Sequence, residues 1–105
     1  MESILNTEKD TCYLCGRWCA HPDKHHVFHG RKHRQLADRE GLFVYLCPEC
    51  HTIGPRAVHR VREIDLKLQQ EAQEVWEKRY RDLVDPDGDA RLEFMKIFGK
   101  NYIYD

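Results

Sequence analysis

The sequence predicts a small α+β domain, in which a cysteine-rich module over residues 11–56 precedes a helical extension over residues 57–105. Two Cys-x2-Cys pairs lie near the ends of the module, and two short aromatic and β-branched runs between them are typical of strands. Beyond the module, apolar side chains recur every three or four residues, as on one face of a helix. The 105 residues fit a single domain, since domains typically contain roughly 100–150 residues.

The two strands are expected at residues 25–29 (HHVFH) and 42–46 (LFVYL), where they would pair as a β-hairpin. Gly41 and Pro48 flank the second strand. Residues 30–40 are polar, so we expect a long loop between the strands. The hairpin would thus fill the long interval between the two cysteine pairs.

The rest of the chain is expected to form two helices. Gly54 and Pro55 can begin a long amphipathic helix over residues 57–83, and the turn-forming run at 85–88 can end it. A short C-terminal helix is expected at 89–98. The long helix carries an apolar stripe, which would be core or a self-association seam. This stripe consists of Val58, Val61, Ile64, Leu68, Ala72, Val75, Trp76, Tyr80 and Leu83.

Four of the five cysteines have the spacing of a zinc site. Zinc takes four thiolates in a tetrahedron, and two Cys-x2-Cys turns in one small chain are typical of it. Cys19 is the spare thiol and the alternative ligand to Cys15, while redox-active or free thiols are the other interpretation. A structural zinc would contribute its binding free energy to folding. The expected zinc ligands are Cys12, Cys15, Cys47 and Cys50.

Charge is unevenly distributed, although the formal net charge is only −1. Residues 17–62 contain nine Lys or Arg against four Asp or Glu, and they hold all seven histidines. Such a basic segment suits a phosphate-rich partner such as nucleic acid, or forms an ordinary solvated face. No run reaches the ~18 apolar residues of a membrane span, and the first residues lack the features of a secretory signal, so we expect a cytoplasmic protein.

Four histidines are candidates for chemistry. His25 and His26 are adjacent in the first strand, so their side chains would point to opposite faces. His51 directly follows the second cysteine pair, and His59 lies eight residues later. Brought together, they supply the parts of a metal-dependent hydrolase: ligands for a divalent ion and a neutral imidazole that activates water. The others are expected to be surface residues or partners of the ligands, namely His21, His29 and His33.

The arrangement CxxCG…HHVF…LFVYLCPECH resembles the HNH, or ββα-metal (His-Me finger), endonucleases, and more narrowly the small HNH-type proteins of phages and prophages. The resemblance covers about residues 12–51. It implies a β-hairpin and a helix that cradle one divalent ion, with a four-cysteine zinc as a brace. It also implies that His25 and His51 are metal ligands and that His26 is the general base. The implied activity is hydrolysis of DNA phosphodiester bonds, by nicking or double-strand cleavage.

The sequence departs from the family's pattern at two positions. The middle asparagine of the pattern has no counterpart, since Asn6 and Asn101 are the only asparagines. His33, or the backbone around Gly41, would take its place. A lysine that often follows the closing histidine by three residues is Gly54 in this chain.

We therefore expect a divalent ion (Mg²⁺, Mn²⁺, Ni²⁺ or Zn²⁺) on His25 and His51, with His59 as a third ligand. DNA is the expected partner, in the cytoplasm of a bacterial host cell, and the long helix would form a homodimer or bind a phage protein. A non-catalytic zinc-binding module for DNA or protein is the alternative function. The side chains expected to contact DNA phosphates are Arg31, Lys32, Arg34, Arg56 and Arg60.

Overall fold

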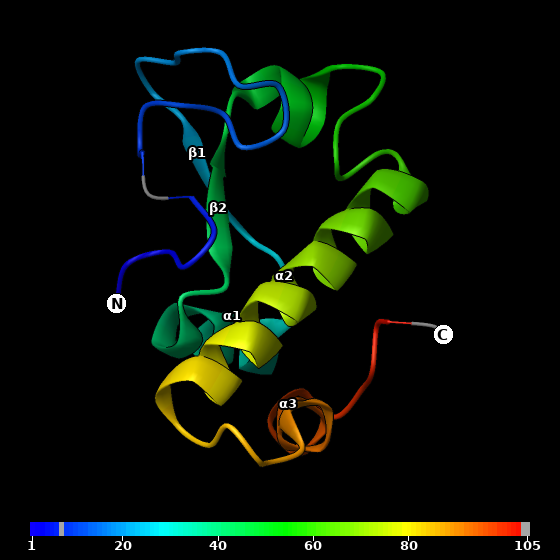
Figure 1. Cartoon of the computed structure of the whole chain (residues 1–105). Coiled ribbons are helices and arrows are strands. Elements are labelled where there is room, and N and C mark those ends of the chain that lie inside the picture. Colours follow the sequence, from blue (N-terminus) through cyan, green and yellow to red (C-terminus); the bar gives the residue numbers. More distant parts are fainter. Residues whose placement is uncertain (7, 104–105) are drawn as a thin grey trace.

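A computed structural model of the chain describes residues 1–6 and 8–103, and it contains a two-stranded antiparallel sheet together with helices (Figure 1). This confirms the predicted small α+β class. None of the helices within the described residues has the length and apolar character needed to cross a membrane. In chain order the elements are β1 (Asp23–His26), α1 (Arg31–Glu40), β2 (Phe43–Leu46), the π-type turn η1 (Glu49–Ile53), α2 (Arg62–Leu83) and α3 (Ala90–Phe98).

β1 and β2 form the predicted hairpin, with His25 opposite Val44 and His26 opposite Phe43. β1 begins two residues earlier than expected and ends before Val27, which leaves the sheet and is buried in the core. The two adjacent histidines differ in exposure, since the His25 side chain is buried and the His26 side chain is half-buried. The hairpin thus presents the two rings to different surroundings, as alternation along a strand requires.

The predicted loop over residues 30–40 is wrong, because helix α1 fills this segment. Leu36 and Ala37 face the core and give the helix a single apolar turn, so the helix depends on tertiary packing more than on its own pattern. Gly41 ends α1 in the left-handed conformation, with φ 75°. A Cβ atom at this position would lie 2.6 Å from the carbonyl oxygen of Glu2, so only glycine fits where the N-terminal segment crosses the hairpin.

The predicted helix start at Gly54 and Pro55 is wrong, because α2 begins at Arg62. Gly54 instead ends η1, and the chain that follows forms turns. The N–H groups of Val58 and His59 donate to carbonyl oxygens of η1, at 2.8 and 3.2 Å. Val58 is buried in the core, so its place in the apolar stripe reflects this turn and not a helix. The turn also brings His59 back to η1.

The buried part of the apolar stripe on α2 belongs to the core of the chain. Leu68, Ala72 and Trp76 are all buried and pack in one cluster with aromatic rings from the rest of the chain. The ring of Phe94 on α3 lies 5.5 Å from the ring of Trp76. The stripe was predicted to be either core or a self-association seam. These three positions belong to the core.

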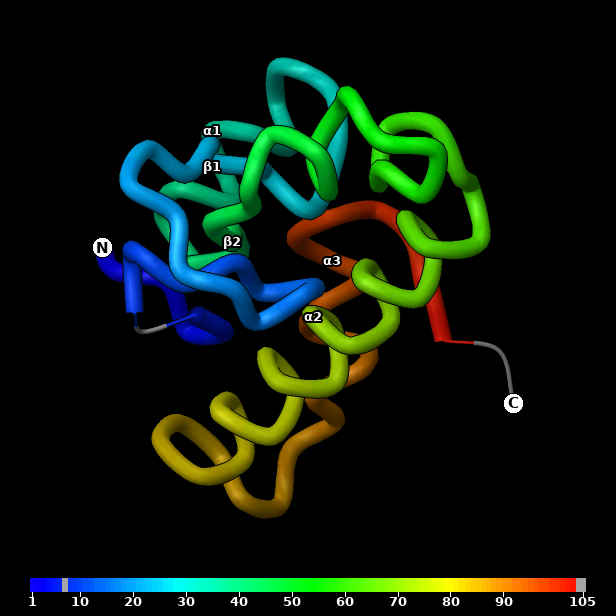
Figure 2. Tube along the Cα trace, turned by 90° about the horizontal axis from the view of Figure 1, so that it is seen from above, coloured from blue at the N-terminus to red at the C-terminus, as the bar shows by residue number. Residues whose placement is uncertain are grey.

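α3 confirms the predicted C-terminal helix, and the chain after it returns along α2 (Figure 2). The Asp89 carboxylate caps α3 by accepting the N–H of Leu92 at 3.0 Å. Further on, the buried amide of Gln73 on α2 accepts the N–H of Tyr102 and donates to Asn101, both at 2.8 Å. These bonds satisfy a buried polar side chain and fix the end of the described chain to the long helix.

Candidate metal centres

Four cysteine sulfurs form a cluster between the loop before β1 and the start of η1. The Sγ atoms of Cys12, Cys15, Cys47 and Cys50 all lie within 4.8 Å of one another, and the four thiols are free. The Sγ atoms of Cys15 and Cys47 are 3.8 Å apart. Two sulfurs bound at about 2.3 Å to a tetrahedral zinc ion have a separation of about 3.8 Å. The cluster can therefore hold a metal such as zinc. Cys19 lies outside it within the described part of the chain.

The electrostatics of the cysteine cluster also favour a cation. A hydrogen bond from Nε of Arg17 to Sγ of Cys15, at 3.5 Å, lowers the pKa of the Cys15 thiol to about 6. Burial raises the pKa of Cys47, and burial together with the neighbouring sulfurs raises that of Cys50. A divalent cation reverses this rise because it stabilises thiolates. The cluster thus has one readily ionised thiol and two that need a cation to ionise.

Three of the histidines expected to bind metal converge in the structure. His25 comes from β1, His51 from η1 and His59 from the turns before α2, and one ring nitrogen of each lies within 4.8 Å of the others. Nε2 of His51 is 3.1 Å from Nε2 of His59. The His25 side chain is 2% exposed, and its Nε2 atom has no hydrogen-bond partner among the described residues. A metal ion would satisfy this buried nitrogen together with its two neighbours.

Asp23 orients one of these rings. Its Oδ2 atom lies 3.0 Å from Nδ1 of His51, which leaves the lone pair of His51 Nε2 directed at the other two histidines. A carboxylate on the second nitrogen is typical of metal-binding histidines, because it fixes the tautomer and the ring orientation. Sequence reasoning missed Asp23, although it lies two residues before His25 and therefore on the same face of the strand.

The surroundings keep two rings of the histidine cluster uncharged. Burial, followed by repulsion from the neighbouring His59 and His51, lowers the pKa of His25 to about 3. Burial also lowers the pKa of His59, followed by repulsion from His51 and His29. Near neutral pH these rings are neutral lone-pair donors, the form in which imidazole binds metals.

His29 lies beside the histidine cluster, but it does not belong to the group of three ring nitrogens. Its ring centroid is 5.7 Å from those of both His25 and His59, and its Nε2 atom lies 2.8 Å from Oδ2 of Asp65 on α2. This hydrogen bond raises the pKa of His29. Of the remaining histidines, His21 is exposed, and the ring of His33 packs on Phe98 at 5.8 Å.

His26 has a different environment, although it follows His25 directly. Its Nε2 atom lies 2.8 Å from Oδ1 of Asp38 on α1, and Nζ of Lys24 contacts the same oxygen at 2.8 Å. The hydrogen bond from Lys24, and after it that from His26, lowers the pKa of Asp38. Sequence reasoning missed Asp38 because residues 30–40 were expected to be a loop.

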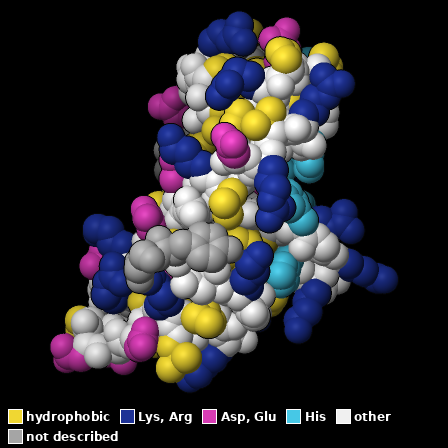
Figure 3. All heavy atoms as spheres, turned by 90° about the vertical axis from the view of Figure 1, so that its right-hand side faces the viewer, with side chains coloured by type: hydrophobic (Ala, Val, Ile, Leu, Met, Phe, Trp, Pro, Cys, Tyr) yellow, Lys and Arg dark blue, Asp and Glu magenta, His cyan; other side chains and the backbone are white. Residues whose placement is uncertain are grey.

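A cleft of about 440 Å³ connects the histidine cluster with His26. Two cations, Lys24 and Arg34, line it, and Figure 3 shows histidine side chains next to Lys and Arg side chains on one side of the molecule. Of the residues expected to contact phosphate, Arg34 is therefore the one that lines the cleft. Arg31 and Lys32 are exposed in the first turn of α1, and Nη1 of Arg60 donates to the carbonyl oxygen of Ile53 at 3.1 Å. The cleft is lined by Lys24, His25, His26, His29, Gly30, Arg34, His51 and His59.

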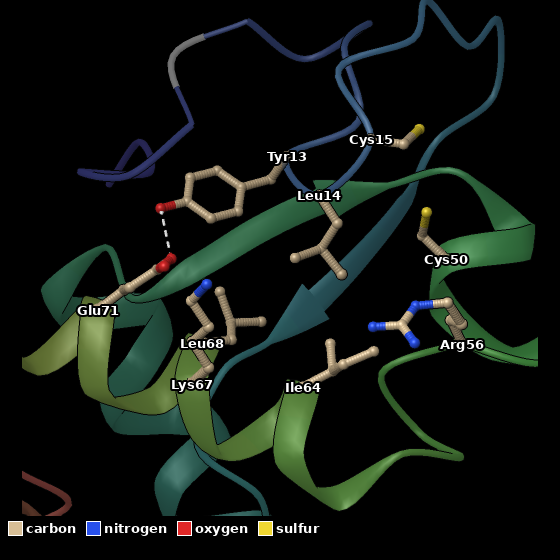
Figure 4. Close-up of a pocket in the computed structure, with 9 residues that line it drawn as sticks. All are labelled: Tyr13, Leu14, Cys15, Cys50, Arg56, Ile64, Lys67, Leu68 and Glu71. Atoms are coloured by element: carbon tan, nitrogen blue, oxygen red, sulfur yellow. Dashed lines mark hydrogen bonds between the residues drawn. The ribbon is translucent and has the colours of Figure 1, made fainter.

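Arg56 lines a separate groove of about 590 Å³ between the cysteine loop and α2 (Figure 4). Leu14, Ile64 and Leu68 make much of its wall apolar. The phenol of Tyr13 donates to Glu71 across one end, at 3.3 Å. This groove contains none of the histidines, so Arg56 lies apart from the candidate catalytic cleft.

The cysteine and histidine clusters meet at η1. Cys50 belongs to the sulfur cluster, and the next residue, His51, belongs to the histidine cluster. A single turn of helix therefore contributes to two candidate metal centres.

A comparison of the chain with protein-family models, with curated proteins and with solved structures finds no match.

Proposed function

We propose that the protein is a metal-dependent, HNH-type DNA endonuclease that hydrolyses phosphodiester bonds. The observation that supports it most is the buried, unpartnered Nε2 atom of His25 beside the ring nitrogens of His51 and His59. The order of elements adds support, because two antiparallel strands are followed by a helical turn that carries His51. In this proposal the protein acts on DNA in the cytoplasm of a bacterial host cell.

His25, His51 and His59 would hold the divalent ion. A set of imidazole nitrogens suits Zn²⁺ and Ni²⁺ better than Mg²⁺, which prefers oxygen ligands. The chemistry that a bound ion supplies is stabilisation of negative charge on the scissile phosphate and on the leaving 3′ oxygen. The neutral state of His25 and His59 fits this set, since both rings offer lone pairs near neutral pH.

His26 would act as the general base and take a proton from the attacking water. It lines the same cleft as the three candidate ligands but is not part of their cluster, and with Nε2 in contact with Asp38, Nδ1 is the nitrogen left for proton transfer. Lys24 and Arg34 line that cleft and would contact the phosphates next to the cleaved bond. The exposed side chains of Arg31 and Lys32 would contact phosphates farther from the cleaved bond.

A zinc ion on Cys12, Cys15, Cys47 and Cys50 would serve as a structural brace. It would join the loop before β1 to η1, and η1 carries the ligand His51. The rigidity of the candidate active site would then depend on zinc, because ligand geometry must be held closely for metal-assisted hydrolysis.

Cleavage of supercoiled plasmid tests the proposal. The zinc-loaded protein, supplied with Zn²⁺, Ni²⁺, Mn²⁺ or Mg²⁺, is expected to produce relaxed or linear DNA. His26→Ala is expected to lower the rate roughly 10²–10⁴-fold, the usual contribution of a general base. His21→Ala is the matched control, because His21 is exposed and does not line the cleft. A wild-type protein that leaves the plasmid intact with all four ions contradicts the proposal.

A non-catalytic zinc-binding module is the second candidate function. The apolar groove along Leu14, Ile64 and Leu68 favours it, because such a groove can take the apolar face of a partner's helix. Counting bound metals separates the two functions. One tightly bound zinc and no second site supports the module, whereas a second site that is lost in His51→Ala supports the nuclease.

A further inference from the structure

We propose that Asp38 is a positioning residue, which fixes the ring orientation and the tautomer of His26. The role rests on the proposed function, in which His26 is the general base. Asp38 lies on α1 and His26 on β1, so the contact joins the helix inserted in the hairpin to the strand that carries the catalytic candidate.

The geometry assigns the two ring nitrogens of His26 different tasks. Nε2 lies 2.8 Å from Oδ1 of Asp38. An ionised carboxylate only accepts hydrogen bonds, so Nε2 must carry the hydrogen. In the neutral ring the lone pair is then on Nδ1, which becomes the atom that can take a proton from water. Without this contact the neutral ring can carry its hydrogen on either nitrogen. Only the tautomer with the hydrogen on Nε2 leaves a lone pair on Nδ1 to take a proton from water.

Asp38 is itself held in place by a second contact on the same oxygen. Nζ of Lys24 lies 2.8 Å from Oδ1, and it also lies 4.1 Å from the centroid of the Phe43 ring on β2. Lys24 and His26 are two residues apart on β1, so they lie on one face of the strand, and both contact the carboxylate. The carboxylate is thus fixed from the strand side by two donors.

The stability of α1 gives no reason for an aspartate at position 38. Asp38 lies near the carboxyl end of the helix, where the helix dipole disfavours a negative charge. Aspartate is also a poor helix former compared with alanine. A carboxylate that is unfavourable for its own helix, yet bonded to His26 and Lys24, is best explained by those contacts.

Neither asparagine of the chain is available for this task. The Asn6 side chain accepts the N–H of Tyr45 at 2.6 Å, and the Asn101 side chain accepts a hydrogen bond from Gln73 at 2.8 Å. Asp38 is the side chain that the structure places in hydrogen-bond contact with the ring of His26.

The tautomer of His26 tests the proposal directly. Long-range ¹H–¹⁵N correlation spectra of the zinc-loaded full chain would be recorded along a pH series, and the tautomer would be read at its alkaline end, because tautomers are defined only for the neutral ring. We expect His26 to be hydrogenated at Nε2 in the wild type and to become a mixture of tautomers in Asp38→Ala. Asp82→Ala is the matched control, because Asp82 forms a similar exposed pair with Lys78 at 2.7 Å. A His26 signal that is the same in Asp38→Ala as in the wild type overturns the proposal.

Cleavage kinetics give the second readout. Asp38→Ala is expected to lower kcat roughly 10- to 100-fold, the usual loss when the partner that orients a functional histidine is removed, and to leave KM unchanged. Alanine is the better helix former, so the melting temperature of the variant should stay close to that of the wild type. A wild-type kcat in Asp38→Ala overturns the proposal. A wild-type protein that cleaves no DNA overturns the proposed function instead, and the tautomer measurement then decides the role of Asp38 alone.

Discussion

Nε2 of His51 and Nε2 of His59 lie 3.1 Å apart and face each other. Because the hydrogen of His51 is on Nδ1, bonded to Asp23, its Nε2 atom presents a lone pair to His59. Two lone pairs at this distance repel unless a proton or a cation lies between them. A hydrogen on Nε2 of His59 or a shared cation satisfies this contact, and His25 adds a third nitrogen to the group.

We expect Asp23→Ala to weaken metal binding at the histidine cluster by about 10- to 100-fold, because the carboxylate that orients His51 is lost. Isothermal titration of Ni²⁺ or Zn²⁺ into zinc-loaded protein measures the change. Asp87→Ala, in the exposed turn between α2 and α3, is the control and should bind metal like the wild type. Equal affinities in the two variants would show that Asp23 plays no part in metal binding.

Zinc removal is expected to destabilise the whole chain. A ligand present at about 1,000 times its dissociation constant stabilises a protein by about 4 kcal/mol, and in a domain of this size that corresponds to about 15 °C or more in Tm. Cys47→Ser should therefore lose bound zinc and melt at least this much lower in calorimetry. Cys19→Ser should keep both, since Cys19 lies outside the cluster. Full zinc content in Cys47→Ser would contradict the assignment of the ligands.

Stability should fall in acid when the histidine cluster is free of metal. The unfolded chain protonates His25 near the ordinary pKa of about 6.5, whereas burial keeps the folded ring neutral down to a pKa of about 3. Between these values the unfolded state binds more protons, so the free energy of unfolding decreases as the pH falls, by up to about 1.4 kcal/mol per pH unit. Urea unfolding at a series of pH values should give a shallower slope for His25→Gln. Parallel slopes would exclude His25 as the source.

Gly41→Ala is expected to destabilise the protein by at least about 1 kcal/mol more than Gly99→Ala. Both glycines end a helix in the left-handed conformation, with φ 75° and 77°, so both variants have the same backbone penalty. At Gly41 the new Cβ atom would also lie 2.6 Å from the carbonyl oxygen of Glu2, whereas nothing lies within 4 Å at Gly99. Chemical denaturation measures the difference, and equal losses would mean that the N-terminal segment moves aside freely.

The elements with strong local signals could be predicted from the sequence. The second strand and the C-terminal helix have apolar patterns between clear turn or cap residues, and the structure has them within one residue of the expected bounds. Helix α1 could not be found in this way, because one apolar turn at Leu36 and Ala37 carries too little periodicity. The start of α2 was missed because Val58 has helical spacing but is buried through a turn.

The candidate site, too, could be predicted from the sequence only in part. The spacing of the cysteines and the histidines was sufficient to name the groups that the structure brings together. The carboxylates on the imidazole rings were not foreseen, because Asp38 and Asp65 reach His26 and His29 only through the packing of α1 and α2. Spacing along the chain identifies the candidate metal ligands, whereas the carboxylates on the neighbouring rings of His26 and His29 depend on tertiary structure.

Because Cys50 and His51 are adjacent in η1, metal bound at one of the two candidate centres would be linked thermodynamically to metal bound at the other. Any difference in the conformation of η1 between the zinc-loaded and the zinc-free chain changes the position of His51 and hence the affinity of the histidine centre. By reciprocity, a metal on the histidines changes the affinity of the cysteines by the same factor.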